Sequence, residues 1–230
     1  MALIKFGGGV TQASGSIGGT TFARNRFGNY NRSRTKPVNP NTALQTAARG
    51  RLAYLAEYWS SQLTSTERGS WATYAAAVPS LNRLGESVYL TGFNQFLRSN
   101  TTRLQGAGTV IDAGPTVLTL PETDTTFACT FTASDQKVNV TFDDGLPWAS
   151  EVGAAMMVYM GQPQNATRNF FGGPWKYVGK LTSTSTSPTA LAAPFTVVAG
   201  QKVWVYARIQ RADGRLSGKF RATGTAIAGA

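Results

Sequence analysis

The chain has 230 residues, of which 42% are hydrophobic, so it can bury one large core or two small ones. It has one cysteine and no histidine, which excludes an internal disulfide, the usual zinc sites, and Ser-His-Asp or Cys-His catalysis. The net charge is +11, and the first 56 residues carry eight Lys/Arg and no Asp/Glu, so most of the basicity is N-terminal.

The start of the chain does not resemble a targeting signal. The apolar residues after Met1 are interrupted by Lys5 and by glycines, and the run is too short for a signal-peptide core. No window approaches the roughly 20 apolar residues of a membrane-spanning helix. We therefore expect a protein made in a cytoplasm, without a standard export signal and without a membrane partner.

Residues 1–40 contain seven glycines and little helical or strand periodicity. We expect an extended basic arm, with at most short strands around Leu3–Phe6 and Thr20–Phe22. The aromatic residues of this segment stand apart from one another, so they are suited to fill pockets on another surface but not to form a core. They are Phe6, Phe22, Phe27 and Tyr30.

Residues 41–105 have the pattern of a small helical unit. Capping-box spacings begin two of the three expected helices, and the third runs from residue 91 to about residue 104. The expected N-terminal capping residues are Thr42 and Thr64. The first helix has about 20 residues, with apolar positions three or four apart that should face inward. These positions are Leu44, Ala48, Leu52, Leu55, Trp59 and Leu63.

The glycine-rich residues 106–120 are expected to form a linker, after which short apolar runs with a period of two begin. Turn signals separate roughly seven such runs over residues 121–230, which favours an antiparallel sandwich of immunoglobulin or fibronectin type III character. The clearest runs are Phe127–Phe131, Val138–Phe142, Ala155–Tyr159 and Val203–Ile209. The expected fold class is α+β, with an extended arm, a helical unit and an all-β sandwich. Because such sandwiches host many functions, the architecture assigns none.

The carboxylates and the cysteine offer little chemistry. Asp143 and Asp144 are the one adjacent acidic pair, and the Gly145 that follows favours a turn over a calcium contact or a catalytic pair. Cys129 lies in an alternating apolar run and is interpreted as a buried strand residue. The Ser/Thr tract 181–190 is interpreted as a solvated loop or edge strand, with a glycan contact as the alternative. We therefore expect no catalytic residue, no metal site and no cofactor.

The basic arm has a more specific interpretation. Arginine forms bidentate contacts with carboxylates, so docking on a protein surface is the preferred hypothesis. The cations can also neutralise phosphates while Phe27 and Tyr30 stack on bases, so nucleic-acid binding is the alternative, and a solvated arm is the third. The candidate partner-binding residues are Phe6, Phe22, Arg24, Arg26, Phe27, Tyr30, Arg32, Arg34 and Lys36.

Three motifs stand in the first hundred residues: G-x-x-F-x-R-N-R-x-G-x-Y-x-R at 19–32, P-x-N-P-x-T-x-x-Q at 37–45, and G-F-N-x-F-x-x-x-N at 92–100. With the glycine-rich start and the tryptophan-bearing helices around Trp59 and Trp71, they resemble a group of mostly uncharacterised proteins of tailed bacteriophages and prophages. The match covers about residues 15–100. The resemblance implies a virion or phage-associated structural role, with a fibronectin-like tail and no catalytic residues.

Together these patterns predict a non-enzymatic structural protein of a tailed-phage virion, which docks by its arm on neighbouring subunits. Capsid decoration is the preferred position, followed by a tail, neck or fibre position. The expected partners are other virion proteins, including further copies of this chain, and the expected location is the virion after synthesis in the host cytoplasm. The alternatives are nucleic-acid binding through the arm, and host-surface or carbohydrate binding through Trp148, Trp175 and Tyr177 of the sandwich.

Overall fold

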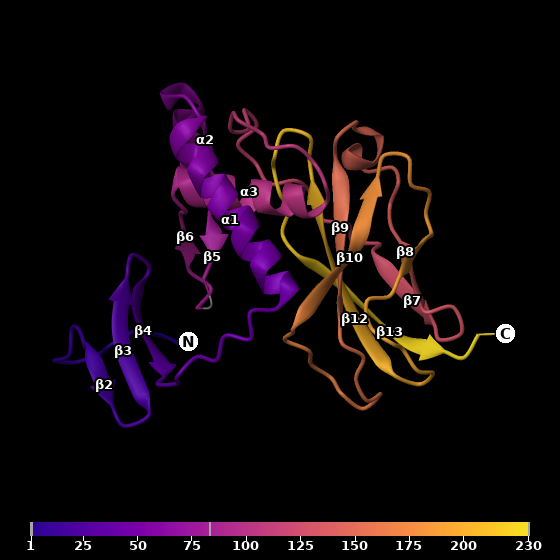
Figure 1. Ribbon diagram of the computed structural model, residues 1–230, viewed down its shortest axis with the longest axis horizontal. Helices are drawn as coiled ribbons and strands as arrows, with labels where there is room; N and C mark the ends of the chain where they lie inside the picture. The colour runs from indigo at the N-terminus through magenta and orange to yellow at the C-terminus, as the bar shows by residue number, and fades with distance from the viewer. Residues whose placement is uncertain (1, 83, 230) are drawn as a thin grey trace.

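The computed structural model describes residues 2–82 and 84–229 and arranges them in three parts along its long axis (Figure 1). A small β-sheet lies at the N-terminal end, three helices lie in the middle, and a seven-stranded sandwich lies at the other end. The predicted α+β class is therefore confirmed.

Residues 2–33 form a four-stranded antiparallel sheet in the order β1-β4-β3-β2. Its strands are β1 (Ala2–Ile4), β2 (Gly15–Ile17), β3 (Thr20–Asn25) and β4 (Gly28–Ser33). The expectation of an extended arm is corrected here, because the expected short strands are paired with two further ones. Gly18 and Gly28 adopt φ angles of 54° and 119° at the two tight turns, which other residues rarely adopt. Every described residue of the sheet is at least partly exposed, so the sheet has no core of its own.

The three helices begin where the sequence predicts. They are α1 (Ala43–Ser61), α2 (Ser65–Ala77) and α3 (Gly92–Gln105). Thr42 and Thr64 form complete capping boxes, and Thr91 Oγ1 accepts a hydrogen bond from the Asn94 amide at 3.2 Å. A hairpin of β5 (Ser80–Leu81) and β6 (Ser87–Val88) connects α2 to α3.

Aromatic side chains form the core of the helical unit. Trp71 is fully buried, and its ring centroid lies 6.3 Å from that of Tyr74 and 5.6 Å from that of Phe96. Both contacts are edge-to-face, the geometry that the ring quadrupole favours. The remaining buried residues of this core are Leu55, Leu63 and Val78.

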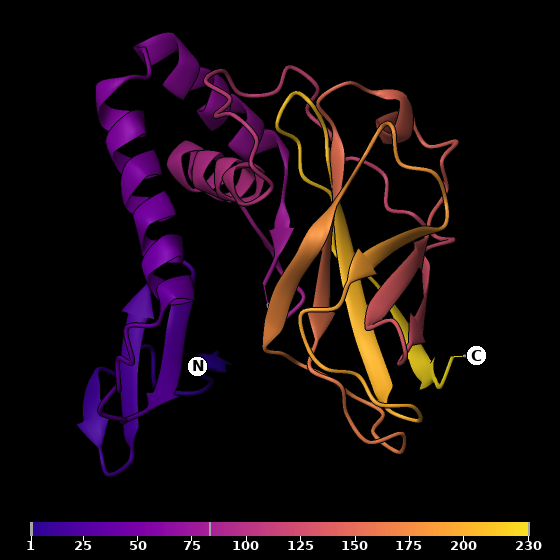
Figure 2. The ribbon, with the colours of Figure 1, turned by 45° about the vertical axis from the view of Figure 1, so that its right-hand side comes forward.

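The expected inward face of α1 is correct only in the second half of the helix. Leu55 and Leu63 are buried, but Leu44 is 71% exposed and Leu52 is 46% exposed. The first half of α1 stands clear of α2 and α3 (Figure 2), so its apolar side chains have no helix to pack against. A helix periodicity specifies a face, but it does not specify that the face is covered.

The C-terminal strands form two packed layers, β7-β8-β11 and β10-β9-β12-β13. Their bounds are β7 (Ala128–Thr132), β8 (Lys137–Thr141), β9 (Ala155–Gly161), β10 (Trp175–Thr182), β11 (Thr189–Ala192), β12 (Lys202–Gln210) and β13 (Phe220–Ile227). The expectation of a wholly antiparallel sandwich is wrong at one place, because β13 pairs with β7 in parallel. This short pairing joins the two layers along one side.

Apolar side chains from both layers fill the space between them. Phe131 and Val140 of one layer are fully buried, as are Met156 and Val205 of the other. The one-turn 3-10 helix η1 (Pro147–Ser150) adds Trp148 to this core at 1% exposure.

The segment expected to be a linker packs back on the helices. Trp71 Nε1 donates a hydrogen bond to the Asp112 carbonyl at 2.7 Å, and the Gly114 amide donates to Ser70 Oγ at 2.7 Å. The side chain of Asn100 donates to the Ile111 carbonyl and accepts from the Ile111 amide. Residues 110–114 therefore belong to the helical unit, which corrects the expectation of a free linker.

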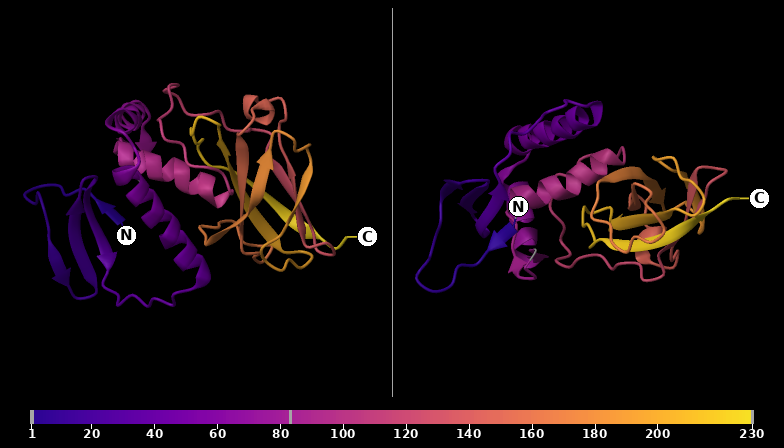
Figure 3. Two further views of the ribbon diagram at one scale, coloured as in Figure 1. Left: turned by 45° about the horizontal axis from the view of Figure 1, so that its top comes forward. Right: turned by 90° about the horizontal axis from the view of Figure 1, so that it is seen from below.

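Helix α3 joins the helical unit to the sandwich (Figure 3). Buried Gln210 of β12 donates through Nε2 to the Ser99 carbonyl at 2.9 Å, and Tyr159 Oη of β9 donates to Gln105 Oε1 at 2.8 Å. A Cβ on Gly106 would lie 2.9 Å from the Met157 methyl group, so the helix end approaches the sheet closely.

Candidate docking surface

The register of the N-terminal sheet divides the predicted binding residues between its two faces. Phe22 and Arg24 of β3 are two residues apart and point to one face. Tyr30 and Arg32 of β4 pair with the β3 residues on either side of Phe22, so they point to the other face. The two aromatic rings are half-buried and the two guanidinium groups are exposed. These four residues therefore do not form one site.

An apolar groove runs between this sheet and the β5–β6 hairpin. The groove has a volume of about 620 Å³. Its apolar lining comes from both sides, with Phe27 at the β3–β4 turn and Leu81 on the hairpin. Phe27 is 36% exposed and Leu81 is 74% exposed, so apolar surface faces solvent along the groove. The full lining is Leu3, Asn25, Phe27, Ser80, Leu81, Asn82, Val88, Leu90 and Arg98.

A second hollow of about 460 Å³ lies beside the groove and contains Phe6. Phe6 and Phe27 are thus brought together, and Leu84 of the hairpin turn also lines this hollow. Lys5 forms an ion pair with Glu86 across it, and this hydrogen bond lowers the pKa of the Glu86 carboxyl below its usual range. An exposed ion pair therefore links the segment after β1 to the hairpin, and such a pair contributes little to stability.

The connection from the sheet to α1 is fixed by asparagine side chains. The Arg49 guanidinium donates to Asn39 Oδ1 at 2.8 Å and to Asn41 Oδ1 at 3.2 Å. Asn41 has a φ of 50°, a conformation that asparagine tolerates better than most residues. This explains the asparagine of the P-x-N-P-x-T motif, Asn39, and indicates that residues 39–41 are held to the first turns of α1.

The cations of this region are exposed and spread over several surfaces. Arg24 donates to Gln12 Oε1 at 3.3 Å, and Arg32 and Arg34 line a polar hollow with Thr21. Arg26 lies in the β3–β4 turn, and Lys36 follows β4. Within residues 2–82 and 84–229, none of these five cations forms a salt bridge. Because Arg24 and Arg32 lie on opposite faces of the sheet, the five cations do not make one continuous stripe for a phosphate backbone.

The hairpin side of the groove was not among the residues predicted from sequence. Leu81, Leu84 and Val88 lie in a stretch with turn residues and no clear period, so they carried no signal of their own. Their role depends on the contact between residues 2–29 and 80–90, and sequence spacing does not report such a contact.

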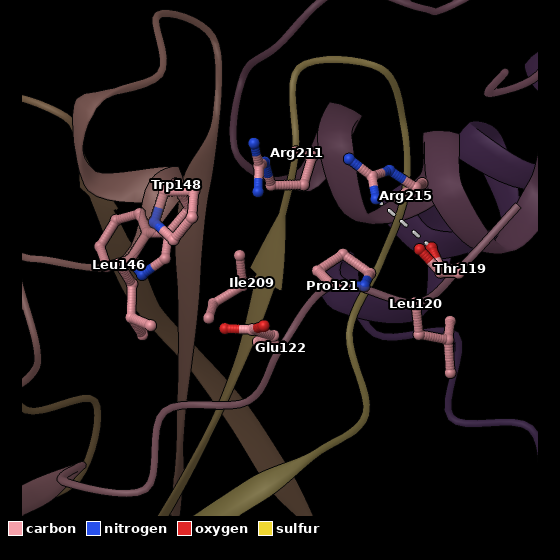
Figure 4. A pocket seen from close by; sticks show the side chains of 10 residues that line it. Thr119, Leu120, Pro121, Glu122, Leu146, Trp148, Ile209, Arg211 and Arg215 are labelled. Atoms are coloured by element: carbon pink, nitrogen blue, oxygen red, sulfur yellow. Dashed lines mark hydrogen bonds between the residues drawn. The ribbon is translucent and has the colours of Figure 1, made fainter. Parts of the chain in front are cut away.

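A small, partly open cavity lies between the 119–122 segment and the sandwich (Figure 4). It has a volume of about 160 Å³, below the size of typical ligand pockets. Two arginines line it, but each already has an acidic partner: Arg211 pairs with Glu151, and Arg215 pairs with Asp213. Glu122 lines the same cavity without a second carboxylate beside it, so the arrangement does not form an acid/base pair.

The sandwich residues considered for carbohydrate binding have different positions. Trp148 is in the core, so it is not available at the surface. Trp175 and Tyr177 are half-buried on the outer face of β10. Trp175 contacts Tyr206 edge-to-face at 4.9 Å, and Tyr177 contacts Tyr159 at 5.5 Å. These rings pack on one another and do not form an open platform.

Three local interpretations, on the acidic pair, the cysteine and the Ser/Thr tract, agree with the structure. The Asp143 amide donates to buried Asp124, and Asp143 Oδ1 accepts from the Gly145 amide at 2.8 Å, as in a turn. Cys129 is 6% exposed on β7, and burial raises the pKa of its thiol to about 12. The Ser/Thr tract runs from the end of β10 through a loop into the edge strand β11.

Comparisons with known proteins add little. No protein-family model and no curated protein matches the chain. Among solved structures, the chain is similar to a "Fn3-like protein from Clostridium thermocellum", with 15% sequence identity and a TM-score of 0.31. That match covers 47% of this chain and 95% of the other. Within the described ranges, none of the helices is long and apolar enough to span a membrane.

Proposed function

We propose that the protein is a non-enzymatic structural component of a larger assembly, and that its N-terminal sheet and β5–β6 hairpin dock on a neighbouring subunit. The observation that carries this proposal is the apolar groove between Phe27 and Leu81, which is open to solvent. An exposed apolar groove of this kind on a protein surface is typical of an interaction site.

The distribution of exposed apolar side chains supports the same location. Ten of the seventeen large hydrophobic residues that are exposed in the described chain precede residue 90, in about two-fifths of its length. They are Val10, Ile17, Phe27, Val38, Leu44, Leu52, Tyr54, Leu81, Leu84 and Tyr89. Burial of one such side chain contributes about 1.5–3 kcal/mol to association, so three or four of them suffice to anchor a subunit.

The open edges of the N-terminal sheet offer a second mode of contact. β1 and β2 are the edge strands, and every residue of β2 is exposed. Unpaired backbone amides and carbonyls on such strands can pair with a strand of another chain. A neighbouring subunit can therefore add main-chain hydrogen bonds to the apolar contacts in the groove.

The resemblance of residues 15–100 to proteins of tailed phages suggests which assembly this is. We propose a virion, with capsid decoration as the preferred position and a tail, neck or fibre position as the next. The partners would be other virion proteins and further copies of this chain. The guanidinium groups of Arg24, Arg26, Arg32 and Arg34 would then contact carboxylates on those partners.

The double variant Phe27→Ser with Leu81→Ser tests this proposal. Both residues are exposed, so the variant should fold normally, yet it should be lost from particles purified from the producing cells. Phe170→Ser is the matched control, because Phe170 is a large side chain, 71% exposed, on the sandwich. Quantitative immunoblotting of purified particles measures incorporation. Equal incorporation of the double variant and the control would exclude the groove as the docking site.

Nucleic-acid binding through the arm is the second candidate, supported by five exposed cations with no acidic partner among the described residues. It requires an affinity that falls steeply with salt, with a log-log slope of about −0.9 per neutralised phosphate on duplex DNA. A flat salt dependence would reject it.

A further inference from the structure

Tyrosine and cationic side chains gather on the outer face of the sandwich, where α3 crosses it. The rings of Tyr159 and Tyr206 stack with their centroids 4.6 Å apart. Lys219 Nζ lies 4.8 Å from the centroid of the Tyr206 ring, and Arg221 stands directly opposite Tyr206 in the pairing of β12 with β13. Arg208 is two residues from Tyr206 on β12, so it points to the same face.

Two further cations approach this group from the helices. Gln210 of β12 is bonded to Ser99 of α3, and Arg98 is the residue before Ser99. Burial and then the charge of Arg98 lower the pKa of Arg208. Burial and then the charges of Arg208, Arg221 and Arg98 lower the pKa of Lys219, so these four cations act on one another.

Arg51 of α1 is the fifth member of the cluster. Burial raises the pKa of Tyr159, and the charges of Arg208 and Arg51 both oppose this rise, so both guanidinium groups lie close enough to Tyr159 to act on its hydroxyl. The cluster is therefore built by α1, α3, β12, β13 and the residue before β13. Its members are Arg51, Arg98, Arg208, Lys219 and Arg221.

The cluster has unused hydrogen-bond donors and no neutralising acid. Nε of Arg208 and Nε of Arg51 are buried and have no hydrogen-bond partner. Within the described part of the chain, none of the five cations forms a salt bridge with a carboxylate. Gln95 of α3, at 1% exposure, also has an unpartnered Nε2, and its spacing places it on the same helix face as Arg98 and Ser99. Buried donors of this kind are costly unless an acceptor meets them.

We propose that this cluster, between the helical unit and the sandwich, binds a multivalent oxyanion of the phosphate class. Guanidinium groups present paired N–H donors that match the oxygens of phosphate, and several of them together balance more than one negative charge. A single carboxylate would neutralise one of five cations and leave most of the repulsion in place. This site is distinct from the apolar groove, although Arg98 lines both.

Arg51 belongs to α1, whereas Arg208 and Lys219 belong to the sandwich. A bound anion would therefore also hold α1 against the sandwich. Ligand that binds only the folded chain raises its stability in proportion to the logarithm of ligand concentration. Anion binding is therefore measurable as a rise in the melting temperature.

Titration of the full-length protein with sodium phosphate, at an ionic strength held constant with sodium chloride, tests the site. We expect a saturable rise in melting temperature and a matching isothermal-calorimetry curve, neither of which chloride or acetate produces. In Arg208→Gln the dissociation constant should increase roughly tenfold or more, the loss of one charge-assisted contact. Arg26→Gln, an exposed arginine outside the cluster, should bind as the unmodified protein does.

The melting temperatures without phosphate separate a binding defect from a folding defect. In chloride alone, Arg208→Gln should melt at the same or a higher temperature, because it removes like-charge repulsion, so weaker phosphate binding cannot be attributed to misfolding. A response to phosphate no larger than that to chloride would overturn the proposal. An equal response in Arg208→Gln and Arg26→Gln would also overturn it, as would acetate binding as tightly as phosphate.

Discussion

The packing of residues 110–114 against α2 can be tested at Gly114. An alanine Cβ there would lie 2.7 Å from the Ser70 carbonyl carbon and 2.7 Å from the Trp71 amide nitrogen. These are backbone atoms of α2, so neither can move aside without displacing the helix. Forced overpacking costs about 1–3 kcal/mol, and strain on the Gly114–Ser70 hydrogen bond adds about 1 kcal/mol. Gly114→Ala should therefore lower the free energy of unfolding by roughly 2–4 kcal/mol.

Urea unfolding followed by tryptophan fluorescence is the appropriate assay, because Trp71 donates its indole N–H to this same segment. Gly50→Ala is the matched control: Gly50 is inside α1, and a Cβ there would meet no atom within 4 Å. That substitution should raise the free energy of unfolding by about 0.5–1 kcal/mol through helix propensity. A Gly114→Ala protein within about 0.5 kcal/mol of the unmodified one would refute the close packing of this segment.

Three smaller effects follow from single groups. Thr64→Ala should cost about 1 kcal/mol in urea unfolding, because it removes the N-cap of α2. Hydrogen bonds from the Thr64 amide and hydroxyl lower the pKa of Glu67 below its usual value. The contribution of the ionised carboxylate to the stability of α2 is therefore complete at neutral pH and is lost as pH falls through the folded pKa. Glu67→Gln should remove this decline in helicity at acid pH. Cys129 should resist a thiol reagent at pH 8 until urea unfolds the chain, and prompt native labelling would contradict its burial on β7.

The helix starts were predictable because their signals are local. A threonine and a residue three positions later are enough to satisfy the first amides of a helix, and both capping boxes are present as predicted. The strand pattern of residues 127–209 was equally local, since alternation records which side of a strand is buried. The parallel contact between β13 and β7 joins distant segments, so no alternation could indicate it.

The N-terminal sheet was harder to predict because neither of its faces is buried. A strand with two exposed faces has no reason to alternate, and here the turns at Gly18 and Gly28 set the register. The apolar groove and the cation cluster were still harder to predict from the sequence. Phe27 and Leu81 line one groove, and the charge of Arg98 acts on Arg208, only after the three parts of the chain have packed together.

Deleting residues 1–36 tests the docking role of the N-terminal sheet most directly. Of the described residues, 2–36 contribute no buried side chain to either hydrophobic core, so the chain truncated by residues 1–36 should keep the unfolding free energy of the full chain within about 1 kcal/mol. It should nevertheless be absent from purified particles, while the full-length protein produced in the same cells is present. Normal incorporation of the folded, truncated chain would contradict the proposal that this sheet anchors the protein.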